Sequence, residues 1–302
     1  MAAKTGVGYN IQMVKNKNSH FGLNISDHSL RFAKIVAVKD GLKLEKFGER
    51  KIPSGVVEFG EIKNAEKLEK FLTALKKEEN LKFAHLSLPL IVLQKHMIKN
   101  YLYAFEHSGI KILSLEFEAQ SLARLLIKKG DLETHMLVDF GEKTTGIYIV
   151  SDGAVKFAST FNFGGVELSN LIQENLNLTF EEAEKVKKEY GLQQNTKNKK
   201  AFPILLDGVS FLYDEIARHF LHWHTRKVEN KKNPIEKIIF CGGSSNLLGL
   251  ADYFSARMKN PVEIADVWVN LPTKEKNVQE LSFKQSLSFA PALGVALLTH
   301  HF

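Results

Sequence analysis

A turn in the middle of the chain carries residue types that could hold a phosphorylated ligand. Asp139 and Gly141 follow an apolar run and precede Thr144 and Thr145. The aspartate could bind Mg²⁺ directly or through water, the glycine permits close backbone approach, and the threonines offer hydroxyl and N–H donors. An acidic hairpin turn can have the same residues without a ligand, so this turn alone is weak support for a phosphate site.

Two glycine pairs open predicted helices elsewhere. Residues 242–246 read Gly-Gly-Ser-Ser-Asn and separate an apolar strand from a helix, while Gly164 and Gly165 precede another helix. The glycines let backbone pass close to a flat ligand, and Ser244 with its neighbours can cap the following helix so that its N-terminus faces that ligand. An ordinary strand-to-helix connection explains each pair about equally well, but the three turns together favour a phosphate-binding site.

These segments occur in the order found in the actin and Hsp70-like ATPase superfamily, and they most resemble the PilM family of type IV pilus assembly. The resemblance covers about residues 21–298. It includes 21–34 in the place of the first phosphate loop, 115–124 in the place of the connecting helix, and the segments 179–187 and 289–297. Each fragment is modest, but their joint order is specific.

The resemblance implies an α/β, actin-like (ribonuclease H-like) fold, duplicated into two lobes with a nucleotide cleft between them. ATP and Mg²⁺ are the implied cofactors. Asp139 would hold the metal, and Glu118 is the candidate for orienting an attacking water. The other implied nucleotide-binding residues are Asn24, Ser26, Ser29, Arg31, Gly141, Thr144, Thr145, Gly164, Gly165, Glu184, Lys187, Gly242, Gly243 and Ser244.

Glu184 and Lys187 lie three residues apart on one face of a predicted helix. The resemblance implies that they reach the ribose and the adenine edge. Without it, a surface ion pair worth a few tenths of a kcal/mol is the simpler interpretation.

The first loop departs from the family pattern, which resembles Asp-Ile-Gly-Ser-Ser-Ser. Here Asn24 replaces the acidic residue and Ser26 replaces the glycine. An amide is a poorer partner for a Mg²⁺-bound water, a Cβ at Ser26 can crowd a phosphate, and Asp27 would repel it. We therefore predict nucleotide binding with slow or absent hydrolysis.

Three segments are predicted: a flexible arm over 1–20, a first lobe over 21–125 and a second lobe over 126–302. The family's usual inserted subdomain is missing near 94–100, which weakens any inference about the partner groove or self-assembly. Apolar periodicity places the elements that position the candidate residues. In the first half these are strands 21–25, 30–38, 42–52 and 84–88 with helix 65–79; in the second, strands 136–138, 146–150, 155–161 and 238–241 with helices 166–175, 180–190 and 204–226.

The composition is that of a globular protein of 302 residues with a formal net charge of +7. Its lysines are scattered, with two polar runs at 193–200 and 226–233 and no interleaved aromatic residues, so nucleic-acid binding is a minor alternative. The single cysteine, Cys241, indicates a reducing compartment. With no apolar run of about 18 residues and no signal-type N-terminus, we expect a cytoplasmic protein without direct membrane insertion.

The expected function is a scaffold that binds ATP and the cytoplasmic tail of a membrane-anchored pilus assembly protein, which would recruit it to the inner face of the membrane. An extended tail would bind beside residues 85–93 and 94–103 of the first lobe. The alternatives are an FtsA- or MreB-like polymerising ATPase, and a sugar or acid kinase of the same fold, which lacks a recognisable catalytic aspartate here. His219, His222 and His224 could suggest a metal. No cysteine or carboxylate lies at a spacing that would complete a zinc site, so we interpret them as histidines on a helix face.

Overall fold

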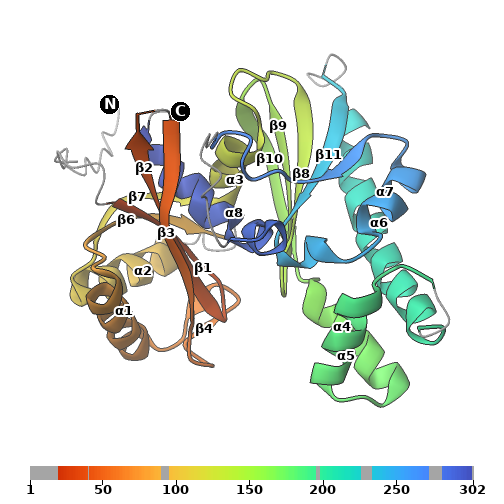
Figure 1. Cartoon of the computed structure of the whole chain (residues 1–302), viewed down its shortest axis with the longest axis horizontal. Coiled ribbons are helices and arrows are strands. Elements are labelled where there is room, and N and C mark those ends of the chain that lie inside the picture. The colour runs from red at the N-terminus through yellow and green to blue at the C-terminus, as the bar shows by residue number, and fades with distance from the viewer. Residues whose placement is uncertain are drawn as a thin grey trace, which may run out of the picture.

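The computed structural model describes residues 20–39, 41–89, 95–194, 198–225, 233–271 and 281–300, so the expected N-terminal arm lies outside it except for His20. Two five-stranded mixed sheets dominate the described chain (Figure 1). Their strand orders are β3-β2-β1-β6-β7 and β10-β9-β8-β11-β12, which is one topology used twice. In each sheet the first strand pairs antiparallel with the next strand and parallel with a later one. The predicted duplicated α/β architecture is confirmed.

The strands of the two sheets differ in how deeply they are buried. β8 and β9 in the second sheet are buried along almost their whole length, whereas β3, at an edge of the first sheet, alternates between exposed and half-buried residues. The first sheet consists of β1 (His20–Ile25), β2 (Ser29–Val38), β3 (Gly41–Lys51), β6 (Phe83–Leu88) and β7 (Lys111–Phe117), and β4 (Val57–Glu58) pairs with β5 (Glu61–Ile62) in a small hairpin. The second sheet consists of β8 (Thr134–Phe140), β9 (Thr145–Ser151), β10 (Ala154–Phe161), β11 (Ile235–Cys241) and β12 (Val262–Ile264).

Helices cover both sheets and fill the space between them. α1 and α2 lie on the outer face of the first sheet, α6 and α7 on that of the second, and α3 and α8 between the sheets (Figure 1). The bounds are α1 (Ala65–Glu79), α2 (Lys95–Ser108), α3 (Glu118–Leu126), α4 (Gly165–Leu176), α5 (Phe180–Tyr190), α6 (Ala201–Thr225), α7 (Leu250–Met258) and α8 (Phe283–Ala296), with short 3-10 helices η4 (Gly243–Asn246) and η5 (Leu297–His300).

Local signals set the ends of the two helices whose predicted bounds are confirmed. At α1, the Asn64 side chain accepts a hydrogen bond from the Lys67 N–H at 2.9 Å, and Asn80 ends the helix in the left-handed conformation. At α5, Thr179 and Glu182 form a capping box. The segment 115–124 is corrected: residues up to Phe117 are strand, and the connecting helix begins at Glu118.

Close backbone packing joins β1, α8 and α3. A Cβ on Gly22 would lie 2.2 Å from the carbonyl oxygen of Ala292, and one on Gly294 would lie 2.1 Å from that of Ser121. Only glycine fits at either position. α8, from the C-terminal part of the chain, therefore packs directly on the first sheet and on α3, and the three elements hold their ends at the cleft in fixed relation.

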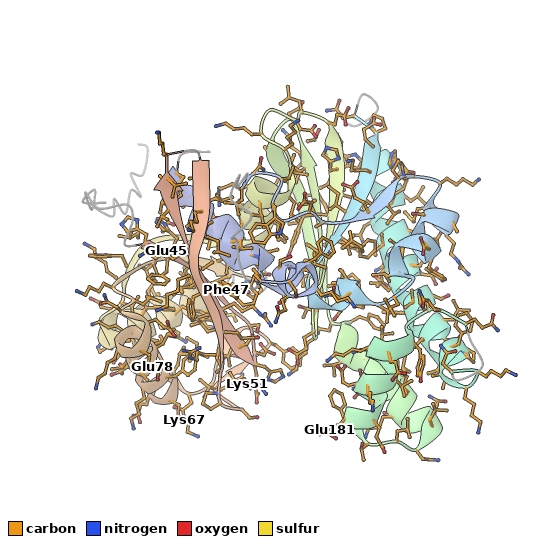
Figure 2. The ribbon with its side chains drawn as sticks, viewed as in Figure 1. Glu45, Phe47, Lys51, Lys67, Glu78 and Glu181 are labelled. Carbon is orange, nitrogen blue, oxygen red and sulfur yellow. The ribbon has the colours of Figure 1, made fainter. Side chains whose placement is uncertain are left out.

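Surface charge is balanced locally. On the first sheet, Arg31 pairs with Glu49 at 2.7 Å, and Lys46 pairs with Glu79 at 2.7 Å. Figure 2 shows Glu45 and Lys51 on the exposed sheet and Glu78 on the neighbouring helix α1. Acidic and basic side chains alternate here, as on an ordinary solvated face.

His85, on β6, is a buried histidine with incomplete hydrogen bonding. Its Nδ1 lies 2.7 Å from Ser114 Oγ, and its buried Nε2 has no partner within the described chain. Burial, with smaller repulsion from His20 and Arg124, lowers the pKa of His85 from 6.5 to about 4. The fold therefore accepts the neutral imidazole.

We expect His85 to make the protein less stable as the pH falls from 6.5 to 4. Its contribution is complete above the unfolded pKa and is lost as the pH falls toward the folded pKa, amounting to ~3 kcal/mol by pH 4. Urea unfolding of the parent and of His85→Gln at pH 7 and pH 4.5 measures this contribution as the difference between their pH dependences. Identical pH dependences would contradict it.

Candidate functional site

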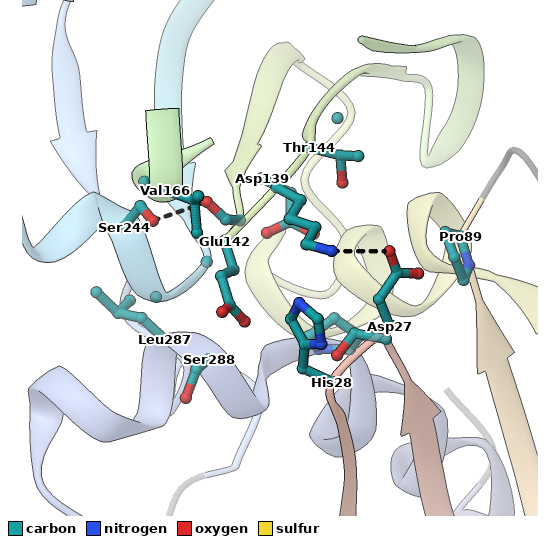
Figure 3. A pocket seen from close by; sticks show the side chains of 18 of the residues that line it. Asp27, His28, Pro89, Asp139, Glu142, Thr144, Val166, Ser244, Leu287 and Ser288 are labelled. Atoms are coloured by element: carbon teal, nitrogen blue, oxygen red, sulfur yellow. Dashed lines mark hydrogen bonds and ion pairs between the residues drawn. The ribbon is translucent and has the colours of Figure 1, made fainter. Parts of the chain in front are cut away.

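A cavity of about 660 Å³ is lined by residues from both halves of the chain (Figure 3). Most of the predicted site residues face it, although they are far apart in the sequence. Ser29, Thr145 and Gly164 do not line it. Those that do are Asn24, Ser26, Arg31, Glu118, Asp139, Gly141, Thr144, Gly165, Glu184, Lys187, Gly242, Gly243 and Ser244.

The turn after β8 closes on itself. The Gly141 N–H donates to the Thr144 carbonyl at 3.0 Å, which leaves Asp139 and Thr144 at the cavity wall. Thr145 is fully buried, and its hydroxyl donates to the Phe163 carbonyl at 2.7 Å. Thr145 therefore holds the turn from behind, and its hydroxyl is not directed to a ligand.

The N-terminus of α4 supports this turn. The N–H groups of Gly165 and Val166 donate to the carbonyls of Gly141 and Glu142 at 3.0 and 2.9 Å, and a Cβ on Gly164 would lie 2.4 Å from the Glu142 carbonyl oxygen. These leading N–H groups are thus used within the protein. The glycines are needed for close packing of α4 against the turn.

The Gly-Gly-Ser-Ser turn forms η4, and the predicted cap is corrected. Ser244 Oγ donates to the Gly141 carbonyl at 2.7 Å, whereas α7 begins later, after Gly249, without a side-chain cap. Gly242 has φ of 84°, and a Cβ there would lie 2.4 Å from Asp139 Oδ1. Ser244 therefore fixes the turn after β8, and Gly242 leaves the space beside the Asp139 carboxylate free of a side chain.

The first turn, residues 24–29 between β1 and β2, is closed by hydrogen bonds between Ser26 and Ser29. The Ser26 N–H donates to the Ser29 carbonyl at 2.9 Å, and the two hydroxyl oxygens lie 3.2 Å apart. Ser26 does not have positive φ, so its backbone does not require glycine. Arg31 also faces the cavity, and its Nε is buried without a partner among the described residues.

Two carboxylates meet at the floor of the cavity. Asn24 Nδ2 donates to Glu118 Oε1 at 2.8 Å, while the Asp139 carboxylate has no hydrogen-bond partner within the described chain. Burial raises the pKa of Asp139 to about 6 against the opposing effect of Arg31. Burial and repulsion from Asp139 raise the pKa of Glu118 to about 8, against Asn24 and Arg31. The charge of Arg31 therefore compensates the two buried carboxylates only in part.

At the other end of the cavity, Glu184 and Lys187 form an ion pair that also lines the wall. Lys187 Nζ donates to the Gly165 carbonyl at 2.6 Å and to Ser169 Oγ at 2.7 Å. Burial opposes ionisation of Glu184, but hydrogen bonds from Lys187, Lys188 and Ser169 outweigh it and hold the pKa of Glu184 at about 2. The pair joins α5 to the start of α4 and is more than a surface ion pair.

Residues 94–300, more than half of the chain, match the family described as Type IV pilus assembly protein PilM. The chain belongs to the PilM family. The resemblance seen in the sequence is thereby confirmed, although the first turn, at residues 24–29, lies outside the matched range. As a PilM-family chain it contains, within its described residues, no helix long and apolar enough to cross a membrane.

Similar solved structures agree with the fold of the PilM family. The PilM–PilN type IV pilus biogenesis complex has a TM-score of 0.74 at 16% identity and covers 94% of this chain and 99% of that one. MreB5 of Spiroplasma citri bound to ADP has a TM-score of 0.67 at 13% identity and covers 94% and 98%. Cell division protein FtsA of Staphylococcus epidermidis is 27% identical over 101 residues, which is 33% of this chain and 22% of that protein. The chain thus spans about a fifth of that curated relative.

Several residues that line this PilM-family cleft were not predicted from the sequence, among them Lys143, Phe59 and Tyr148. Phe59 lines the cavity from the first half of the chain, and Lys143 and Tyr148 line it from the second half. A Cβ on Gly146 would lie 2.2 Å from Tyr148 Oη, and Gly146 pairs with Asp139 across β8 and β9, so the phenol lies beside the acidic floor. Alternation along β9 could have indicated that Gly146 and Tyr148 share a face. No local pattern indicates Phe59.

The histidines of α6 make contacts within the helix and with β10. His219 Nδ1 lies 2.7 Å from the Glu215 carbonyl oxygen and its Nε2 3.1 Å from Ser159 Oγ, while Phe157 packs against the rings of His219 and His222. Among described residues, the group with metal-ligand spacing is instead Asp131, Glu133 and His135.

Proposed function

We propose that this PilM-family chain is a scaffold of type IV pilus assembly that binds ATP with Mg²⁺ between its lobes. The observation that carries the proposal is the floor of the cavity, where the carboxylates of Asp139 and Glu118 are buried together and that of Asp139 lacks a hydrogen-bond partner within the described chain. Carboxylate oxygens are the ligands that Mg²⁺ takes in such sites, so the donor set fits the cation. Bound Mg²⁺ would neutralise these carboxylates and the phosphates of the nucleotide.

The residues divide by position along the cavity. Asp139 would hold the cation, Thr144 and the turn from Gly141 would face the phosphates, and Glu184 with Lys187 would border the sugar and base. Asn24 and Arg31 both lower the pKa of Glu118 and thus favour its charged form. Glu118, as the candidate for orienting water, already accepts from the Asn24 amide. We therefore infer slow or absent hydrolysis.

For the partner, we propose the cytoplasmic tail of a membrane-anchored pilus protein. The similar PilM–PilN complex supports a partner of this kind. The expected groove borders β6, and the predicted missing insert lies where residues 90–94 fall outside the described chain and α2 begins at Lys95. The proposal implies a cytoplasmic protein held at the membrane by its partner. The FtsA similarity favours, as the second candidate, a polymerising ATPase of division or shape.

Calorimetric titration of the purified protein tests nucleotide binding. We expect Mg·ATP and Mg·ADP to bind at one site, and binding to weaken strongly when EDTA removes the metal, because the acidic floor then repels the phosphates. A parallel turnover assay should show little hydrolysis. Absence of binding, or binding that is indifferent to metal, would remove the support for an ATP site.

Affinity capture from the native cells after crosslinking tests the partner. We expect recovery of a single-pass pilus assembly protein, and loss of that crosslink when surface residues beside β6 are substituted. A matched set of substitutions on α6, on the far side of the second sheet, serves as the control (Figure 1). Recovery of division proteins alone would replace the pilus proposal by its alternative.

A further inference from the structure

The Asp27 carboxylate occupies an anion-binding site made by the first lobe. The N–H groups of Phe59 and Gly60 donate to its two oxygens, each at 2.9 Å. Both residues have positive φ, 49° and 73°, so two successive N–H groups are presented to one acceptor. Consecutive backbone donors of this kind form a concave anion site. Here the protein fills that site with its own side chain.

A lysine from the second lobe completes the site. Lys143 Nζ lies 3.7 Å from Asp27 Oδ2, an ion pair that joins the first turn to the turn after Asp139 (Figure 3). The same ammonium lies 5.9 Å from the centroid of the Phe59 ring, within the range of a cation–π contact. Asp27, Phe59 and Lys143 all line the cavity, so this pair bridges the two sides of the cleft.

The bridge is weak, but the acidic partner is firmly held. A 3.7 Å separation is near the limit of an ion pair, and the Lys143 side chain is 32% exposed, so little free energy is needed to separate the charges. Asp27 is only 14% exposed. Phe59 and Gly60, which hold this carboxylate, are themselves fixed by Tyr101, a buried residue of α2. Its hydroxyl donates to the Gly60 carbonyl at 2.9 Å.

We propose that Asp27 and Lys143 form a latch across the ligand-free cleft, in which the Asp27 carboxylate stands in for the terminal phosphate of a nucleoside triphosphate. This inference rests on the proposed nucleotide site. On binding, the terminal phosphate takes Lys143 from Asp27, because it carries more negative charge and more acceptor oxygens than a carboxylate. A diphosphate leaves the latch closed.

The latch makes the cleft distinguish nucleotides by phosphate number. Asp27 is fixed by Phe59 and Gly60, so its charge remains near the incoming phosphate after Lys143 has moved. The triphosphate thus has to displace one interaction and tolerate one repulsion that the diphosphate avoids. The opening of the latch separates the two lobes at this point, and it also frees the exposed ring of Phe59 from its cation.

The test compares Asp27→Asn, Lys143→Ala and the double variant by calorimetry with Mg·ATP and Mg·ADP. Asparagine keeps the volume and an oxygen that can accept from the turn. We expect Asp27→Asn to raise ATP affinity about fivefold with little effect on ADP, and Lys143→Ala to lower ATP affinity about as much. In the Lys143→Ala background, neutralising Asp27 should have a smaller effect, since there is no ammonium left to release. Asp214→Asn, an exposed position on α6, is the matched control.

The outcomes separate this inference from the proposed function. If the parent binds neither nucleotide, the nucleotide site itself is wrong and the latch falls with it. If the parent binds both but Asp27→Asn changes neither affinity, or changes both equally, the latch alone is overturned. An equal gain from Asp27→Asn with and without Lys143 would also overturn it, because the two side chains would then act independently.

Discussion

Asp139→Asn is expected to weaken Mg²⁺-dependent nucleotide binding strongly while making the ligand-free protein more stable. The amide keeps the shape of the carboxylate but removes the charge that faces the cation, a loss of ~3 kcal/mol or about a hundredfold in affinity. In the absence of ligand, the same change removes a carboxylate whose burial raises its pKa to about 6, and we expect a gain of ~1 kcal/mol. A loss of nucleotide affinity together with a gain in the stability of the ligand-free protein would identify Asp139 as a residue that serves binding at a cost in stability.

Calorimetry with Mg·ATP and urea unfolding without ligand measure the two effects. Asp214→Asn, exposed on α6, is the control and should change neither. Parent-like Mg·ATP affinity in Asp139→Asn would show that this turn does not hold the metal. A destabilised ligand-free variant would show that the carboxylate is satisfied by the protein, contrary to the charge arrangement at the floor.

Gly294→Ala should destabilise the protein by about 3 kcal/mol and displace the candidate site. The added methyl carbon would lie 2.1 Å from the backbone oxygen of Ser121, so α8 and α3 must move apart. α3 begins with Glu118, one of the two carboxylates at the cavity floor. Nucleotide affinity should therefore fall together with stability, even though Gly294 does not line the cavity.

Gly243→Ala is the matched control for unfolding of the ligand-free protein. A methyl there would come no closer than 3.5 Å to Ser288 Cβ, an ordinary contact, and Gly243 does not have positive φ. Its stability should remain within about 0.5 kcal/mol of the parent. If Gly294→Ala unfolds at the parent's urea concentration, the close helix contact does not limit the distance between the lobes.

The sequence was sufficient where local chemistry determines structure. Asn64 and the Thr179–Glu182 capping box mark helix starts by contacts within one turn, and the bounds of α1 and α5 were predicted from the pattern. α2 was not predicted, because residues 94–100 were interpreted as the remnant of an insert, although a helix begins at Lys95. Element type followed from periodicity, but the order of segments, through its resemblance to the PilM family, indicated the duplication.

The residues of the candidate site could be located from the sequence better than their contacts could. Most of the residues that the motifs named line the cavity, but Ser29, Thr145 and Gly164 do not, and the Thr145 hydroxyl donates to the Phe163 carbonyl instead. These differences depend on how the turns are oriented in three dimensions. The hydrogen bond between Asn24 and Glu118 joins positions 94 residues apart. The contact between Asp27 and Lys143 is similarly remote. Such pairings depend on the packing of the two sheets, which no short pattern encodes.

The position of α8 also constrains how the protein is made. Residues 283–296 leave the ribosome long after β1 and β2, yet they pack on these strands and cover Gly22. During synthesis the first sheet therefore emerges with one apolar face uncovered. It can bury that face only after residues 283–296 have been made. Such long-range closure is slow and exposes the nascent chain to aggregation, so we expect the growing polypeptide to depend on chaperones that bind apolar surface.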